Sequence, residues 1–158
     1  MYSTEEIYPC LKQHPKLIHN SIFLLNKKYK PLTSCQRIAQ LYKDFETTDV
    51  MVTSSFAATS AFLLKLVSDT NLKQEIYFID TGYHFDDTLK YKSILQAKYN
   101  LNVKSVSAIK EEHEFTTKDE TWKKNPDFCC SINKVQPLDR IKQHYKIWMS
   151  GLMITDHL

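Results

Sequence analysis

The sequence predicts an α/β domain with a doubly wound, mainly parallel sheet and helices on both of its faces. Short apolar runs typical of strands alternate with longer segments in which apolar residues recur at helical intervals. That order is expected of parallel strands joined by helical crossovers. The chain has 158 residues, of which 42% are apolar and 25% are charged. This is the composition of a globular protein, and the length fits one domain.

Residues 1–32 are predicted to form an amino-terminal helical extension packed on the core, and residues 33–158 to form the α/β domain itself. Three prolines interrupt the extension, which limits it to one or two short helices. The first residues lack a basic start followed by an apolar core, the pattern of a secretory signal. A cytoplasmic location is therefore expected.

The elements of the domain follow in order along the chain. Thr33 and Gln36 have the spacing of a capping box, which predicts the start of a helix. Val50–Val52 and Ile76–Ile79 are short, wholly apolar runs, as in strands covered on both faces. The prediction is a helix over 34–46, a strand over 50–52, a helix over 57–68, a strand over 76–79, a helix over 86–99, a strand over 101–106, a helix over 135–144 and a strand over 146–150. Residues 108–128 are polar, and their structure is left open.

Composition and charge exclude several classes of function. No apolar run approaches the roughly 20 residues that span a bilayer, so no membrane partner is expected. The formal net charge is +3, which is too small for a dedicated nucleic-acid binder but is compatible with an anionic small ligand. In a reducing location, the four cysteines are expected to be thiols unless they bind metal or take part in chemistry.

The segment Thr53–Phe56 follows the first predicted strand and precedes a helix. In open α/β sheets, ligands bind beyond the carboxyl ends of the strands. There the hydroxyl groups of Ser54 and Ser55 would lie beside free backbone N–H groups at the positive end of a helix dipole, which suits phosphate or sulfate. The simpler interpretation is a serine that caps the helix. Neither the G-x-x-x-x-G-K-[ST] nor the G-x-G-x-x-G fingerprint occurs in the chain.

The segment Asp80–Phe85 follows the second predicted strand. Asp80 is able to accept a hydrogen bond from a ribose hydroxyl or an adenine amino group. Gly82 is one of only two glycines in the chain, which indicates either a turn with positive φ or the close approach of a flat ligand. His84 fits three roles, as a base, a ligand or a turn residue, and the turn is favoured.

Cys129 and Cys130 are adjacent in a third polar segment, with Lys134 shortly after them. Adjacent cysteines are able to bind one metal or cluster, but a closed zinc or iron–sulfur site needs four ligands. Cys10 and Cys35 are far from this segment and stand in unrelated contexts. A lysine near the pair would attract anions and favour a thiolate.

Together these segments resemble the assimilatory adenylyl-sulfate and phosphoadenylyl-sulfate reductases. That family carries S-S-F-G, L-D-T-G-x-x-F-x-E-T, C-C-x-x-R-K-x-x-P-L and W-x-x-G-[LQ]-R-[RK], in this order. The corresponding segments here are Ser54–Phe56, Ile79–Thr88, Cys129–Leu138 and Trp148–Leu152. Each motif is weak alone, but four in the same order are specific, and both glycines of the chain fall inside them.

The resemblance implies a fold, a ligand and a set of contacts. The fold would be adenine nucleotide α-hydrolase-like, and the ligand would be adenylyl sulfate or its 3′-phosphorylated form, phosphoadenylyl sulfate. The two serines would bind phosphate and sulfate oxygens, the Asp-Thr-Gly turn would line the nucleoside pocket, and Lys134 would face the sulfate. The substrate-binding residues implied by position are Ser54, Ser55, Phe56, Asp80, Thr81, Gly82, Lys134 and Gly151.

The resemblance also implies a reaction, the reduction of the sulfonucleotide to sulfite in sulfate assimilation. In the family, the cysteine of an E-C-G-[IL]-H tail attacks the sulfur and the nucleotide leaves. Thioredoxin or glutaredoxin then releases sulfite. In the cluster-bearing branch, a cysteine pair such as Cys129 and Cys130 supplies half of the ligands of a [4Fe–4S] cluster.

The sequence departs from the family pattern at positions that bear on function. Ala57 replaces the glycine of the S-S-F-G turn, Asn133 replaces an arginine, and Met153 and Ile154 replace two basic residues. Each lost charged hydrogen bond would weaken ligand binding by about 1–3 kcal/mol. The chain stops at Leu158 without the tail motif.

We therefore expect a shortened member of the reductase family, with no catalytic nucleophile assigned and with an incomplete cluster site, hence no cofactor in the isolated chain. The alternatives are a non-catalytic adenine-nucleotide-binding protein and an ATP-pyrophosphatase-like adenylating protein, although the S-G-G-x-D-S motif of the latter is missing. A metal-binding module built on the cysteine pair is a third. The oligomeric state is open, and exposed apolar surface would favour a homodimer.

Overall fold

The computed structural model of the chain describes residues 15–151, with side chains from residue 21 onward. All predicted site residues lie in this range, whereas Cys10, Met153 and Ile154 lie outside it. The chain divides into two compact units, 1–41 and 42–158. Helix α2 (Ser34–Asp44) continues from one unit into the other, so this division does not test the boundary predicted after residue 32.

The first unit contains helix α1 (Pro15–Tyr29) and the start of α2. The backbone N–H of Thr33 donates to Gln36 Oε1 at 2.9 Å, and the N–H of Gln36 donates to Thr33 Oγ1 at 3.4 Å. The predicted capping box is thus confirmed. The guanidinium group of Arg37 donates to the carbonyl oxygens of Tyr29 and Lys30, which lie at the end of α1. These bonds satisfy carbonyl groups that a helix end leaves without partners.

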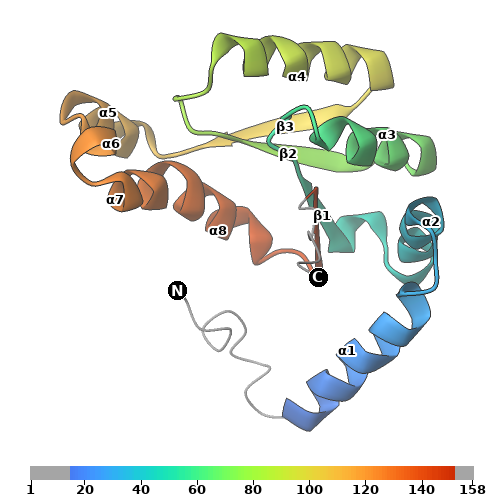
Figure 1. The fold of residues 1–158 in the computed structure, drawn as a ribbon. Helices are drawn as coiled ribbons and strands as arrows, with labels where there is room; N and C mark the ends of the chain where they lie inside the picture. The colour runs from blue at the N-terminus through green and yellow to red at the C-terminus, as the bar shows by residue number, and fades with distance from the viewer. Residues whose placement is uncertain (1–14, 152–158) are drawn as a thin grey trace, which may run out of the picture. The chain divides into compact units, whose positions relative to one another are not determined.

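The second unit is built on a four-stranded parallel sheet with the order β3-β2-β1-β4. The strands are β1 (Val50–Thr53), β2 (Glu75–Asp80), β3 (Asn102–Ser107) and β4 (Ile147–Ser150). In Figure 1, α3 (Ser60–Thr70) and α4 (Asp86–Tyr99) cover one face, and the helical run that ends in α8 (Gln136–Lys142) covers the other. This arrangement confirms the predicted doubly wound α/β fold.

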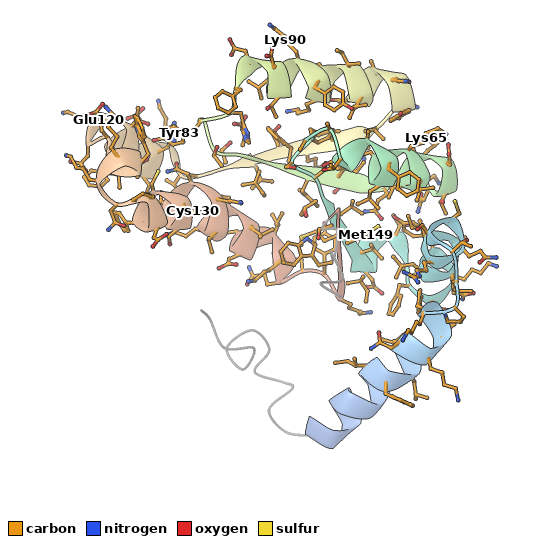
Figure 2. The ribbon with its side chains drawn as sticks, viewed as in Figure 1. Lys65, Tyr83, Lys90, Glu120, Cys130 and Met149 are labelled. Carbon is orange, nitrogen blue, oxygen red and sulfur yellow. The ribbon has the colours of Figure 1, made fainter. Side chains whose placement is uncertain are left out.

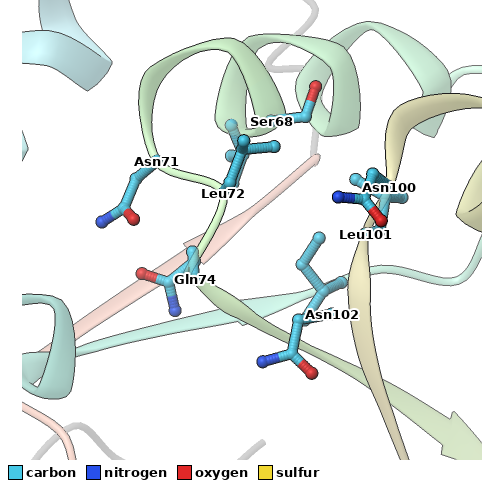
Figure 3. Close-up of a pocket in the computed structure, with 9 residues that line it drawn as sticks. Ser68, Asn71, Leu72, Gln74, Asn100, Leu101 and Asn102 are labelled. Carbon is cyan, nitrogen blue, oxygen red and sulfur yellow. The ribbon is translucent and has the colours of Figure 1, made fainter.

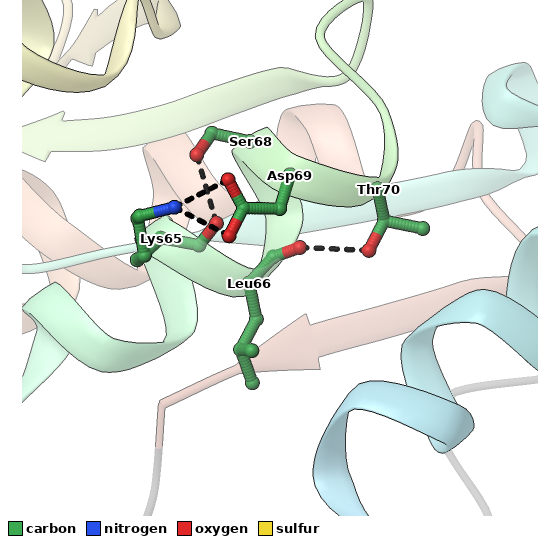
Figure 4. A network of polar contacts seen from close by, with 5 residues as sticks. All are labelled: Lys65, Leu66, Ser68, Asp69 and Thr70. Carbon is green, nitrogen blue, oxygen red and sulfur yellow. Dashed lines mark hydrogen bonds and ion pairs between the residues drawn. The ribbon is translucent and has the colours of Figure 1, made fainter.

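The core lies where the central strands meet these helices. Val50, Met51 and Val52 of β1 are fully buried, as expected of a strand covered on both faces. The ring of Phe78 on β2 is also fully buried. Figure 4 shows polar contacts along α3, among them the pair formed by the exposed side chains of Lys65 and Asp69, one turn apart. The same helix therefore has one apolar face and one polar face.

Several predicted element boundaries were wrong. The helix expected over 57–68 begins at Ser60, because residues 54–57 are irregular and residues 58–59 form a turn. The short 3₁₀ segment η2 (Thr47–Asp49) follows α2, which ends at residue 44 rather than 46. The undecided segment 108–128 contains α5 (Lys110–Lys118), α6 (Thr121–Lys124) and most of α7 (Pro126–Cys130).

The helix predicted over 135–144 starts nine residues early in the structure, at 126. Helix α7, the π-helical segment η3 (Ser131–Val135) and α8 form one continuous run. The Asn125 side chain begins it by accepting the N–H of Phe128 at 3.1 Å, and Pro126 occupies the first turn. No helix within residues 15–151 is long and apolar enough to cross a bilayer.

Candidate functional site

Two turns lie at one edge of the sheet. Strand β1 ends at Thr53 and β2 ends at Asp80, and the two strands are parallel neighbours with Thr53 opposite Tyr77. The segments that follow them therefore emerge at the same edge, where open α/β sheets bind ligands. The structure thus brings the serine turn and the Asp80–Phe85 turn together, as the sequence predicts.

The serine turn after β1 is held by its own hydroxyl groups. Ser54 Oγ accepts the N–H of Phe56 at 3.0 Å, and Ser55 Oγ accepts the N–H of Ala57 at 3.4 Å. Ser54 is buried and Ser55 is exposed. Both oxygens act as acceptors in these bonds, which leaves the hydroxyl hydrogen of each serine for another acceptor, such as an anion oxygen.

Phe56 has a structural role that its predicted place in the ligand site did not include. Its side chain is only 1% exposed and packs edge-on against Phe78, with ring centroids 5.7 Å apart. Its φ is 53°, a left-handed conformation uncommon for a bulky residue. Because the ring belongs to the core, only the backbone of Phe56 is able to contact a ligand at this turn.

The turn after β2 is stabilised by two side chains of its own. Asp80 Oδ1 accepts the N–H of Gly82 at 3.1 Å, and Thr81 Oγ1 accepts the N–H of Tyr83 at 3.3 Å. The ring of His84 packs on Phe78, with centroids 4.6 Å apart, and His84 Nε2 lies 3.0 Å from the carbonyl oxygen of Ile79. Of the three roles considered for His84, these contacts match that of a turn residue.

Gly82 is required here for two independent reasons. Its φ is +73°, and a Cβ at this position would lie 2.5 Å from His113 Cε1 and 2.7 Å from His113 Nε2. The close approach that the sequence indicated therefore exists, but within this chain the neighbour is the imidazole of α5. By contrast, among the residues that the structure describes, a Cβ on Gly151 would meet only Leu63 Cδ2 at 3.7 Å, an ordinary contact.

The two cysteines differ in environment, although they are adjacent. Cys129 is buried and Cys130 is exposed, both near the end of α7. The π-helical segment follows directly, and such segments are frequent at functional sites. Figure 2 labels Cys130 on α7 and Tyr83 beyond β2. Lys134 on η3 is exposed and has no ion-pair partner among residues 21–151.

Asn133 is a buried residue whose amide joins His113 and Thr116 of α5 to the backbone of Cys129 by hydrogen bonds. It is 2% exposed, and its Oδ1 lies 2.8 Å from His113 Nδ1. Its Nδ2 donates to Thr116 Oγ1 and to the carbonyl oxygen of Cys129, both at 3.0 Å, and lies 3.5 Å from Cys129 Sγ. Asn133 stands where the family has an arginine, and the structure shows that its amide is enclosed and hydrogen-bonded by protein; the cost of the lost cation to ligand binding stays a prediction.

The cysteine pair does not by itself provide a complete cluster site. A [4Fe–4S] cluster is usually held by four thiolates. Within the described part of the chain, no group of three or more His, Cys, Asp or Glu side chains is placed to hold a metal ion. Cys35 belongs to the other compact unit. Of the four ligands that the resemblance implies, Cys129 and Cys130 correspond to two, and their role as ligands stays a prediction.

The sequence did not point to His113 and Thr116. These residues of α5 lie between the Gly82 turn and Asn133, which follows the cysteine-bearing helix α7. His113 stands between glutamates in a segment that shows no strand or helix periodicity, so it resembles a solvated surface position. The only signal in the sequence was Gly82. Because glycine is scarce in this chain, Gly82 indicated the close approach of another group, but it did not indicate which residue approaches.

The resolved pKa shifts lie away from this edge. At the amino end of β2, the hydrogen bond from Lys104 holds the pKa of Glu75 below its usual value, and burial raises the pKa of Tyr77. Burial likewise raises the pKa of Tyr42. Between α5 and α6, the hydrogen bond from Lys124 lowers the pKa of Asp119.

Two hollows occur at the opposite, amino-terminal edge of the sheet. Figure 3 shows a narrow crevice between the end of α3 and the starts of β2 and β3, which has no free volume for a water molecule. A second hollow of about 450 Å³ is lined mainly by residues before β1 and β2 and by His144 and Tyr145. Neither contains a residue of the four motifs, so neither is the predicted site.

Residues 49–156 match the phosphoadenosine phosphosulfate reductase domain. The chain belongs to this family. The match includes both turns, the cysteine pair and β4, and it confirms the resemblance drawn from the four motifs. Family membership gives each motif its context, whereas the role of each site residue in ligand binding stays a prediction.

Relatives of known name agree with this assignment. An adenosine 5′-phosphosulfate reductase of Mesorhizobium japonicum is 35% identical over 127 residues, covering 77% of this chain and 48% of the relative. The corresponding protein of Oceanobacillus iheyensis is 32% identical over 119 residues, covering 73% and 50%. The chain of this phosphoadenosine phosphosulfate reductase family member therefore spans about half the length of these relatives.

The fold is also similar to that of a solved family structure. The crystal structure of phosphoadenylyl-sulfate reductase from Candida auris, in a phosphate complex, superposes with a TM-score of 0.69. It covers 84% of this chain and 68% of that protein, with 24% sequence identity. This likeness confirms the fold and carries no statement about ligands of this chain.

Proposed function

We propose that this chain is the nucleotide-binding part of a reductase that converts adenylyl sulfate or phosphoadenylyl sulfate to sulfite in sulfate assimilation. The observation that carries the proposal is the meeting of the serine turn and the Asp80–Phe85 turn at one sheet edge in a chain of this family. Family membership favours this function over an ATP-pyrophosphatase-like one.

The serine turn is suited to the phosphate and sulfate oxygens. Ser55 is exposed, and the hydroxyl hydrogens of both serines are available while their oxygens hold the turn. A hydroxyl that is already fixed by its turn loses little freedom when an anion binds, which favours affinity. The exposed ammonium group of Lys134 supplies a positive charge for the sulfate.

The nucleoside is assigned to the turn of Asp80, Thr81 and Gly82. Asp80 uses Oδ1 for the turn, so its other oxygen is the acceptor for a ribose hydroxyl or an adenine amino group. Because the His113 ring fills the space beside Gly82, the nucleoside has to approach this turn from the side away from α5.

The chemistry proposed for the whole enzyme needs a thiolate in line with the departing oxygen. The thiolate forms a bond to sulfur, the sulfur–oxygen bond breaks, and the nucleotide leaves with that electron pair. A second thiol, from thioredoxin or glutaredoxin, then forms a disulfide with the first and releases sulfite. The sequence resemblance places the first thiolate in a tail motif that these 158 residues do not contain. A cytoplasmic location and a homodimer are parts of the same proposal.

The experiment that tests the assigned contacts compares matched variants by calorimetry. Ser55→Ala and Lys134→Gln each remove one proposed contact from an exposed side chain, and each should weaken adenylyl sulfate binding by about tenfold. Lys98→Gln, an exposed lysine at the far end of α4, is the control and should bind as the wild type does. Equal affinities for all four proteins would place the ligand elsewhere.

A further inference from the structure

We propose that His113 is a positioning residue that couples the Gly82 turn to Cys129. A ligand bound at the turn would then change the reactivity of the buried Cys129 thiol. Three contacts in series carry the inference, and all lie within the second compact unit. The ligand part of the inference rests on the proposed function, whereas the coupling itself does not.

The first contact is steric. The imidazole edge of His113 occupies the space that a side chain on residue 82 would fill, with Cε1 2.5 Å and Nε2 2.7 Å from the ideal Cβ position. Tyr83 packs edge-on against the same ring, with centroids 5.5 Å apart. The turn is therefore unable to move toward α5 without displacing His113.

The second contact is a hydrogen bond whose direction is fixed. The carbonyl oxygen of Cys129 only accepts, so the Asn133 atom 3.0 Å from it is the amide nitrogen. Asn133 Oδ1 then faces His113 at 2.8 Å, and since that oxygen also only accepts, His113 Nδ1 carries the proton. This leaves His113 Nε2 as the nitrogen that faces Gly82.

The third contact reaches the thiol. Asn133 Nδ2 lies 3.5 Å from Cys129 Sγ, and the asparagine is only 2% exposed. Thr116, which is fully buried, braces the link because its hydroxyl donates to the carbonyl of His113 and accepts from Asn133. Because Thr116, Asn133 and Cys129 are buried and hydrogen-bonded to one another, a displacement of the His113 ring is passed on to Asn133 and to the neighbouring thiol.

Cys129 reactivity is the readout that tests the coupling without any nucleotide. In a background with Cys10, Cys35 and Cys130 replaced by serine, Cys129 is the single thiol, and its rate of reaction with 5,5′-dithiobis(2-nitrobenzoate) is measured. Gly82→Ala should change this rate by about threefold or more, because the new Cβ pushes on the His113 ring. Lys98→Ala, on the exposed surface at the far end of α4, should leave it unchanged.

A double-mutant cycle separates coupling between Gly82 and His113 from a general loss of stability. His113→Ala removes the ring, so adding Gly82→Ala to it should have almost no further effect on the Cys129 rate. His113→Gln keeps an N–H donor for Asn133 Oδ1 and should preserve the wild-type rate, whereas His113→Ala should not. Additive effects of the two substitutions, or equal rates in the glutamine and alanine variants, would overturn the proposal.

AMP binding tests the ligand part separately. Saturating AMP should alter the Cys129 rate in the single-thiol protein and leave it unaltered after His113→Ala, although calorimetry should still detect AMP binding to that variant. If AMP binds to both proteins and the rates respond alike, His113 does not carry the coupling to the ligand. If AMP binds to neither, the ligand part of the inference fails, and the double-mutant cycle alone decides the role of His113.

Discussion

Gly82 shows how a single residue can satisfy two requirements at once. A side chain there would be strained by φ +73° and would collide with the His113 ring. We predict that Gly82→Ala lowers the free energy of unfolding by about 1–3 kcal/mol, from left-handed strain and displacement of the ring. Urea denaturation measures this loss. Gly151→Ala is the matched control and should change stability by less than about 0.5 kcal/mol. Equal losses for the two variants would contradict the steric reading of Gly82.

At the same scale, the sequence identified residues better than it identified their contacts. Ser54, Asp80 and Gly82 lie at the predicted edge because strand ends are readable from short apolar runs. The buried roles of Phe56 and Asn133 were not predictable from the motifs. Each depends on neighbours distant in sequence, Phe78 for the one and His113 for the other, and no local pattern specifies such a pair.

At the scale of elements, strands β2 and β3 are joined by an ion pair as well as by their backbone. Lys104 on β3 bonds to Glu75 at the start of β2, and this bond holds the pKa of Glu75 below its usual 4.5. A carboxyl group whose pKa is lower in the folded state stabilises the fold above its unfolded pKa, and this contribution is lost as pH falls through the folded pKa.

We predict that the pair's contribution to stability disappears in acid. Glu75→Gln should be less stable than the wild type at pH 7, and the difference should be smaller at pH 3, because it declines once the pH drops below the unfolded pKa of 4.5 and is lost as the pH falls through the folded pKa. Urea denaturation at both pH values measures it. High salt at pH 7 should also shrink the difference, because the lysine is half-exposed. A difference that persists unchanged in acid would assign the loss to packing instead of charge.

The elements that the sequence predicted least well are those around the cysteine pair. Helix α4 has the bounds that the sequence predicted, Asp86–Tyr99. The α5–α7 region has short helices joined by tight turns, one of them with Glu120 at φ +51°. Three short helices hold too few apolar positions for a period to emerge, and a π-helical segment shifts the phase of the run that follows.

The two thiols of helix α7 differ in exposure, and they lead to a prediction about iron–sulfur cluster binding. Cys129 is buried and Cys130 is exposed, and together they make two of the four ligands that a [4Fe–4S] cluster usually needs. We predict that the monomeric 158-residue chain, reconstituted with iron and sulfide without oxygen, holds no complete cluster. Iron analysis with visible absorption measures this. About four irons per monomer with cluster absorption would contradict it.

At the scale of the whole molecule, the reaction proposed for the whole enzyme requires a thiol placed in line with the departing oxygen. The thiols nearest the site are held in a helix, and attack on sulfur needs in-line placement. We therefore predict that the 158-residue chain, supplied with adenylyl sulfate, thioredoxin and excess reductant, releases no sulfite above background. Sulfite formed at enzymatic rates and abolished by Cys130→Ser would show instead that the helical pair contains the nucleophile.

The central claim is that an adenine sulfonucleotide binds at this edge of the sheet. Calorimetric titration of the 158-residue chain with adenylyl sulfate, phosphoadenylyl sulfate, AMP and ATP is the most direct test. The account predicts that at least one of the two sulfonucleotides binds more tightly than AMP and ATP, since the serine turn and Lys134 offer contacts to the sulfate. Tightest binding of ATP, or no heat from any of the four nucleotides, would contradict it.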